Sequence, residues 1–179
     1  MDAWVWILIA AAAVVVLAVV ALEVSRRRSE HRTERLRGQF GPEYDRADED
    51  ELDRRLERRQ TLELRPLSDS ARERYATEWQ DVQARFVDEP AGTLREAHRL
   101  VSQLMAEVGY PTEDFERQAA DISVDHPVVV ERYRAAHAVY QDDREGTATL
   151  ERQRQALVDY RALFDELLDG HREREAART

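Results

Sequence analysis

An uncharged run near the N-terminus is the feature that most constrains how this chain folds. It extends from Trp4 to Leu22, which is 19 residues without a charged side chain. As a helix with a rise of ~1.5 Å per residue, the run would span roughly 28 Å, close to the thickness of the hydrocarbon core of a bilayer. Trp4 and Trp6 stand where interfacial aromatic residues anchor such a span. We therefore predict an N-terminal transmembrane helix within residues 1–25.

The residues that flank the run predict its orientation. No basic residue precedes it, and six arginines follow it: Arg26, Arg27, Arg28, Arg32, Arg35 and Arg37. Because positively charged flanks stay in the cytoplasm, we expect a single-pass protein of the bacterial inner (cytoplasmic) membrane, with the N-terminus outside and the C-terminal domain inside. The same arginines would face anionic headgroups of the lipid bilayer.

A cleaved signal peptide is the alternative interpretation of the run, and it would make the protein secreted. Val19 and Ala21 would suit the peptidase. The run is longer than the usual core of a signal peptide, and no basic residue stands before it. We therefore favour the membrane span.

Composition excludes several classes of chemistry. The chain has no cysteine, and all 27 basic residues are arginine. Disulfides, thiolate nucleophiles and zinc sites built on sulfur are therefore excluded, and so is chemistry that needs a lysine. Residues 38–179 hold 33 of the 37 acidic residues and 21 of the 27 arginines, a formal charge of −12. Because the arginines alternate with acids throughout, we expect no nucleic-acid partner.

Residues 26–61 are predicted to form an arginine-rich juxtamembrane segment and a charged helical arm. Pro42 suits the first turn of a new helix. From Glu43 to Gln60 the only large apolar residues are Tyr44, Leu52 and Leu56. Because charged helix faces are usually just solvated, we favour a spacer that buries little. An arm that docks a partner is the alternative.

From residue 62 to 170 the pattern is that of a helical bundle domain. Four apolar stripes recur at helical spacing, with a short helix expected after Thr112. The stripes are Tyr75, Trp79, Val82 and Phe86; Leu94, Ala97, Val101, Leu104 and Val108; Val129, Tyr133, Ala136 and Tyr140; and Leu150, Leu157, Tyr160, Phe164 and Leu167. Ser68 is a candidate N-cap, and Gly109 and Gly170 are expected to end helices. We predict an all-α fold, in which a small antiparallel helical bundle follows the transmembrane helix and the arm, and residues 171–179 form a disordered polar tail.

The stretch DISVDHPVVVERYRAAH, residues 121–137, gathers several polar side chains around Pro127. Proline is tolerated only in the first turn of a helix, so a helix is expected to begin there. Asp125 is then well placed as its N-cap, and Ser123 offers a second local acceptor. Adjacency in sequence does not make a catalytic triad. We therefore interpret the stretch as a joint between two helices.

His98 and His137 each fall on the apolar face of a predicted helix. If these helices pack together, the two imidazoles would approach each other and could share a carboxylate or a metal. The favoured alternative is that each is a neutral core histidine with one hydrogen bond. His98 and His137 also lack the Glu three residues earlier that two-iron bundles need. We therefore assign no catalytic, cofactor-binding or metal-ligating residue, and no cofactor.

Six stretches, in this order, resemble an uncharacterised family of bacterial, often actinobacterial, proteins. They are FGPEYDR (40–46), LRPLS (64–68), VQARFVDEPAG (82–92), GYP (109–111), DISVDHP (121–127) and YRALFDELL (160–168). The family consists of single-pass membrane or secreted helical proteins. No activity or ligand is attached to it, so the resemblance implies no site residue.

The sequence by itself determines no biochemical activity. The anchor, the charged arm and the lack of catalytic motifs favour a membrane-tethered, non-enzymatic helical adaptor or scaffold, which binds a protein partner or itself. The alternative is a metal-dependent enzyme or sensor that uses the inward-facing His98 and His137.

Overall fold

The computed structural model describes residues 4, 23 and 30–176, with side chains up to Asp169. The chain divides into two compact units, residues 1–39 and 40–179. The predicted membrane span lies outside the described residues apart from Trp4, so it stays a prediction. None of the helices that are described is both long and apolar enough to cross a bilayer.

The second unit is built from helices, and the described residues contain no strand. A 3₁₀-helix, η1, comes first and six α-helices follow: η1 Gly41–Arg46, α2 Glu49–Thr61, α3 Asp69–Arg85, α4 Pro90–Val108, α5 Phe115–Asp125, α6 Pro127–Arg144 and α7 Leu150–Ala176. The prediction of an all-α helical bundle is therefore confirmed for this part of the chain.

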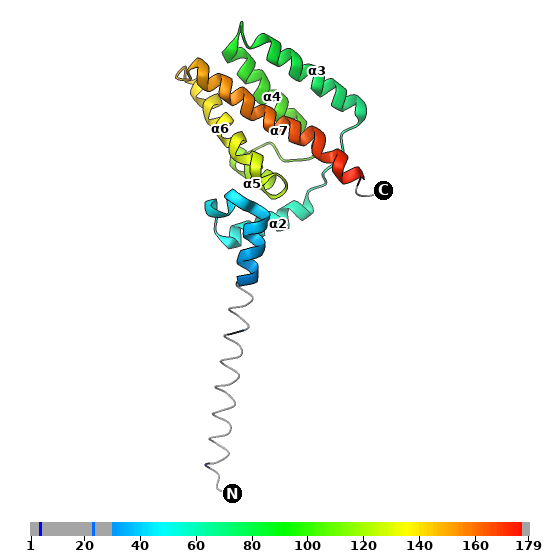
Figure 1. The fold of residues 1–179 in the computed structure, drawn as a ribbon, viewed down its shortest axis with the longest axis vertical. Helices are drawn as coiled ribbons and strands as arrows, with labels where there is room; N and C mark the ends of the chain where they lie inside the picture. Colours follow the sequence, from blue (N-terminus) through cyan, green and yellow to red (C-terminus); the bar gives the residue numbers. More distant parts are fainter. Residues whose placement is uncertain (1–3, 5–22, 24–29, 177–179) are drawn as a thin grey trace. The chain divides into compact units, whose positions relative to one another are not determined.

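Helix α7 is the centre of the bundle (Figure 1). It packs against both α4 and α6, and α3 packs against α4. Helix α5 lies on α6, and α2 lies on α5. The short connections between α3 and α4, and between α6 and α7, reverse the chain, so that these neighbours are antiparallel.

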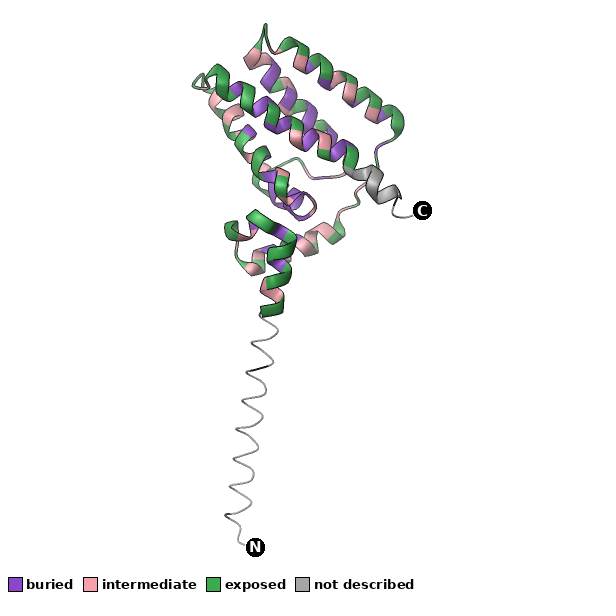
Figure 2. Ribbon diagram, viewed as in Figure 1, coloured by how far each residue is buried: buried purple, intermediate pink, exposed green. Residues whose placement is uncertain are grey.

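The core follows the predicted apolar stripes, except that Leu150, the first residue of the last predicted stripe, is exposed. Buried positions line the inner faces of α4 and α7, whereas the outer face of α3 is exposed (Figure 2). Trp79 of α3 stacks on Phe164 of α7, with ring centroids 4.6 Å apart. Tyr133 and Tyr160, from α6 and α7, are the largest fully buried side chains. Because these side chains come from α3, α6 and α7, they join the outer helices into one core.

Local signals set most helix ends. Ser68 caps α3 by accepting a hydrogen bond from the amide of Ala71 at 3.1 Å, as predicted. Gly109 ends α4 with φ +107°, and a Cβ there would lie 2.6 Å from the carbonyl oxygen of Glu63. Only glycine fits both restraints. Helix α7, by contrast, continues past Gly170 to Ala176, so the predicted end of the last helix was wrong.

Candidate functional site

The charged segment of residues 41–61, named here the strap, packs onto the bundle. It comprises η1 and α2, and these contact α6 and α5, respectively. Leu52 is fully buried, and the charged side chains of Glu43 and Arg55 are buried as well. The interpretation of this segment as a solvated spacer that buries little was therefore wrong. Its polar residues find partners on the bundle that the segment's own sequence does not reveal.

Glu43 is the most deeply buried charged residue of the strap, with no exposed surface. Its Oε1 accepts a hydrogen bond from Nη1 of Arg134 in α6 at 2.7 Å. Arg55 of α2 places Nη1 3.6 Å from Oε2, and Nε of Arg46 lies 3.4 Å from Oε1. Removing a carboxylate from water is costly, and three guanidinium groups offset that cost here. Glu43 therefore joins η1, α2 and α6 at one point.

A row of arginines on α2 meets a row of polar side chains on α5. Arg58 donates to Asp121 at 3.1 Å, and Asp121 is almost fully buried. Arg55 donates to the hydroxyl of Ser123 at 3.2 Å, and that hydroxyl donates to the carbonyl of Ala120 at 2.6 Å. The acceptors belong to the DISVD part of the stretch that was interpreted as a joint. This stretch is therefore the surface on which the strap lies.

Glu51 organises the same arginines from their own helix. Its carboxylate accepts from Arg54, Arg55 and Arg58 at 3.0–3.4 Å. Partial burial acts to raise the pKa of Glu51, but the hydrogen bonds from Arg54, Arg58 and Arg55 outweigh it and lower the pKa. These hydrogen bonds within α2 orient the guanidinium groups toward their partners on α5.

Asp125 does not cap α6, which corrects the prediction made from the sequence. Helix α5 runs to Asp125, so the N-cap position of α6 falls on His126, and no side chain caps α6. Asp125 instead accepts hydrogen bonds from the hydroxyl of Tyr110, at 2.8 Å, and from Nε of Arg59. His126 places its Nδ1 3.1 Å from Glu166 of α7. The expected junction between two helices is present, but the carboxylate of Asp125 binds the strap and does not cap α6.

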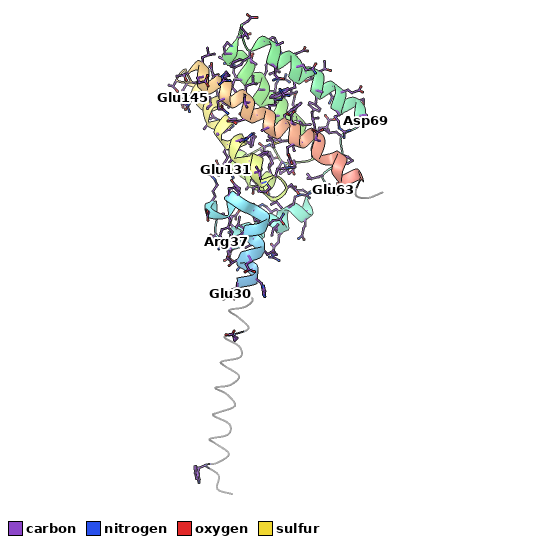
Figure 3. The ribbon with its side chains drawn as sticks, in the orientation of Figure 1. Glu30, Arg37, Glu63, Asp69, Glu131 and Glu145 are labelled. Carbon is purple, nitrogen blue, oxygen red and sulfur yellow. The ribbon has the colours of Figure 1, made fainter. Side chains whose placement is uncertain are left out.

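The exposed end of the strap contact lies at Glu131 of α6, which Figure 3 labels. Arg46 donates to Glu131 at 3.0 Å, and about half of each side chain is exposed. Beside α2, a cleft of about 530 Å³ is lined by Glu51, Arg55, Arg58, Glu116, Arg117 and Ala120. Two of its three arginines are already paired within the strap contact, so the cleft borders that contact.

His98 and His137 do approach each other, with ring centroids 5.4 Å apart. His98 stacks on Tyr140 at 4.0 Å, and His137 stacks on Phe115 at 3.6 Å. Nδ1 of His98 lies 3.0 Å from the hydroxyl of Tyr160. Packing of α4 against α6 and α7 brings these rings together. The sequence indicated the two faces correctly but not the aromatic surroundings.

Both histidines are held in the neutral form. Burial, with the repulsion of His137 second, lowers the pKa of His98 to about 4. Burial also lowers the pKa of His137, although Glu116 acts in the opposite direction. Two neutral imidazoles could supply two nitrogen ligands to a metal. Within the described residues, however, no group of three or more His, Asp or Glu side chains could hold a metal ion.

Sequence reasoning missed Glu43, Arg134 and the arginines of α2 as partners of the DISVD stretch. A signal was present: Arg55 and Arg59 share one face of α2, and Asp121 and Asp125 share one face of α5, each pair at a spacing of four. Complementary spacing of opposite charges is compatible with such an interface. This spacing does not by itself identify the interface, because many other acidic residues in this chain are also four positions apart.

Comparison with models of protein families, with curated proteins and with solved structures finds no match for this chain. The family resemblance based on the six stretches therefore stays a prediction. Two of those stretches, FGPEYDR and DISVDHP, supply Glu43, Arg46, Asp121, Ser123 and Asp125 to the strap contact.

Proposed function

We propose that this chain is a membrane-tethered, non-enzymatic adaptor, whose helical bundle binds a protein partner or a second copy of itself. The uncharged run 4–22 would anchor it in the bacterial inner membrane. The six arginines that follow would keep the bundle in the cytoplasm. In such an anchored protein, a connecting segment joins the membrane span to the bundle, and the strap forms the C-terminal part of that segment.

The observation that carries the proposal is the set of ion pairs between the strap and the bundle, in which one partner of each pair is buried. Glu43 binds Arg134, and Asp121 binds Arg58. Buried charges that satisfy one another serve to hold elements in a defined arrangement, because breaking such a pair leaves an uncompensated charge. In an adaptor, this arrangement would make the segment that leads from the anchor part of the folded domain.

The experiment that tests the proposal is in-cell crosslinking of the full-length protein, followed by mass spectrometry. We expect crosslinks between the bundle and a protein partner or a second copy, and we expect them to be lost when residues 1–25 are deleted. A reporter fused after Thr179 should be active only if it functions in the cytoplasm. Activity of a reporter that works outside the cytoplasm would refute the topology and favour a secreted protein.

A metal-dependent enzyme or sensor is the second candidate, and the approach of His98 to His137 favours it. Bound metal in the purified full-length protein would support this candidate. A melting temperature that rises with zinc, manganese or iron(II), and that no longer rises in His137→Ala, would support it further. A melting temperature unaffected by metals or chelator would exclude it.

A further inference from the structure

A groove along α4 is lined by hydrogen-bond donors and arginines, although the domain as a whole is acidic. The groove has a volume of about 440 Å³ and lies where α4, α6 and the segment after α4 meet. Its polar lining includes Arg95, His98, Arg99, Ser102, Thr112 and Tyr140. None of its lining residues, all of which belong to the described chain, is a carboxylate. Residues 38–179 carry a formal charge of −12, so this absence makes the groove a local exception.

Arg99 supplies the groove with a positive charge that no carboxylate neutralises within the described chain. Its Nη1 donates to the amide oxygen of Gln103 at 2.8 Å, and its side chain is exposed. Arg95 is partly neutralised, because its Nη1 lies 3.1 Å from Asp143. An exposed guanidinium with free N–H groups is the side chain best suited to bind a carboxylate through two hydrogen bonds. The groove therefore favours anions.

His98 adds a neutral donor to the same groove. The hydroxyl of Tyr160 is fully buried, and its one hydrogen bond within the described residues is to Nδ1 of His98. A buried hydroxyl needs an acceptor, so the O–H of Tyr160 donates to Nδ1. The neutral ring then carries its proton on Nε2. This N–H forms no hydrogen bond within the described chain, so it is available to a ligand in the groove.

The shape of the groove favours a segment of protein chain over a small molecule. Sites for small molecules enclose most of the ligand surface, whereas this groove is broadly open to solvent. A second hollow of about 440 Å³ lies on the other flank of α4, against α3, and its lining includes the carboxylate of Glu78. Both hollows share Arg99, Gln103 and Ala106. An extended segment could therefore cross α4 at Arg99, with its acidic residues in the first groove and uncharged residues beside Glu78 in the second hollow.

We propose that this groove binds an acidic segment of a partner protein, with Asp or Glu carboxylates at Arg99 and Arg95 and an N–H of His98 as an additional donor. The stacked rings of His98 and Tyr140 would contact the apolar parts of the segment. This inference rests on the proposed adaptor function and identifies the chemistry of the partner.

A fluorescently labelled hexaglutamate peptide tests the groove on the full-length protein in detergent micelles. We expect binding that Arg99→Glu weakens by about tenfold at low salt, because the substitution replaces attraction by repulsion. Arg132→Glu is the matched control, since Arg132 is an exposed arginine of α6 without an ion pair in the described structure. It should leave the affinity nearly unchanged. Equal loss in both variants, or no binding of the peptide, would refute the proposal.

Two further arms identify the source of the anion. A hexaglutamine peptide should not bind, and inorganic phosphate should not displace hexaglutamate at equal concentration. Displacement by phosphate would show a site for small anions and refute the peptide proposal. Raising the salt from about 0.01 M to about 1 M shortens the screening length from ~30 Å to ~3 Å and should abolish hexaglutamate binding.

A photo-crosslinking side chain at Ala106 separates this proposal from the adaptor function. In cells, we expect Ala106 to capture acidic peptides of a partner, and we expect Arg99→Glu to abolish the capture. If a partner crosslinks elsewhere on the bundle but not at Ala106, the adaptor function stands and the groove proposal fails. If crosslinkers placed over the whole bundle capture no protein, the adaptor function fails, while the hexaglutamate measurement still tests the groove.

Discussion

His98 illustrates how burial changes the chemistry of one residue. Its ring lies between Tyr140 and the hydroxyl of Tyr160, and a second imidazole is close by. Each of these neighbours disfavours a charged ring, since the aromatic rings exclude water and His137 would repel a second positive charge. The hydrogen bond from Tyr160 also selects the tautomer with a proton on Nε2.

The lowered pKa of His98 predicts a dependence of stability on pH. The unfolded chain takes up a proton near pH 6.5, but the folded chain does so only near pH 4. The unfolded state therefore binds more protons between these values, and the free energy of unfolding falls as the pH falls. Because the ring is partly exposed, we expect a loss of only about 1–2 kcal/mol.

Chemical denaturation at a series of pH values measures this loss. The variant His98→Asn keeps an acceptor for Tyr160 but does not titrate, so its loss over the same range should be smaller. NMR of the imidazole nitrogens should find Nε2 protonated at neutral pH. A pKa of His98 near 6.5 in the folded protein would contradict the prediction.

Asp125 binds the strap, so substitutions of Asp125 should change stability as the loss of an ion pair does, and not as the loss of a helix cap does. As a helix cap it would tolerate Asn, because Asn caps as well as Asp. As the partner of Arg59 and Tyr110, it should lose about 1–2 kcal/mol of stability in Asp125→Asn. A double-mutant cycle with Arg59→Gln should give a coupling free energy of about 1 kcal/mol. No coupling would mean that the contact with Arg59 contributes nothing to stability.

The strap is the element whose stability depends most on buried charge. Truncation in Glu43→Ala would leave Arg134 and Arg55 without their shared carboxylate, so we expect a loss of about 3–5 kcal/mol. Glu131→Ala removes only an exposed pair with Arg46 and should cost less than about 1 kcal/mol. Thermal unfolding of the two variants tests this difference.

Hydrogen exchange should show where the effect of Glu43→Ala lies. Amides of α2 should exchange faster in the variant, while those of α4 and α7 stay protected, because the latter helices do not depend on the strap contact. If α4 and α7 lost protection to the same extent as α2, the strap would be part of the cooperative core and not a separate layer on it.

On the scale of the whole molecule, one core joins the outer helix α3 to the central helix α7. Trp79 is almost fully buried and stacks on Phe164, so Trp79→Ala should cost about 3–5 kcal/mol. Val87, which follows α3 and is exposed, is the control, and Val87→Ala should change the stability by less than about 0.5 kcal/mol. Similar losses in the two variants would mean that α3 contributes little to the core.

Two fragments test whether the bundle needs the strap. Residues 62–170 contain the predicted bundle, and residues 40–176 add η1 and α2. We expect both to be helical by circular dichroism. The shorter fragment should melt at a lower temperature, because Asp121 and Ser123 lose their arginine partners. An unfolded shorter fragment would make the strap essential for folding, and equal melting temperatures would make it dispensable.

The sequence predicted those features that depend on residues close together in the chain, namely the buried faces and the ends of helices. Apolar spacing indicated the buried faces of α3, α4, α6 and α7, because the period of a helix is a property of the backbone. Ser68 and Gly109 marked helix ends, since a capping hydroxyl and a left-handed backbone act over a few residues. The inward positions of His98 and His137 followed from the same spacing.

Tertiary structure alone decided which of these faces meet. Glu43 and Arg134 are 91 residues apart in the sequence, and Arg58 and Asp121 are 63 apart. No local pattern specifies such pairs. Acidic residues and arginines alternate along the sequence, so each has many possible partners, and the packing of the helices brings only a few of them within reach. Asp125 had two plausible roles for the same reason. Because α5 runs to Asp125, this residue is not at the N-cap position of α6, and the docking of α2 on α5 supplies Arg59 as the partner of its carboxylate.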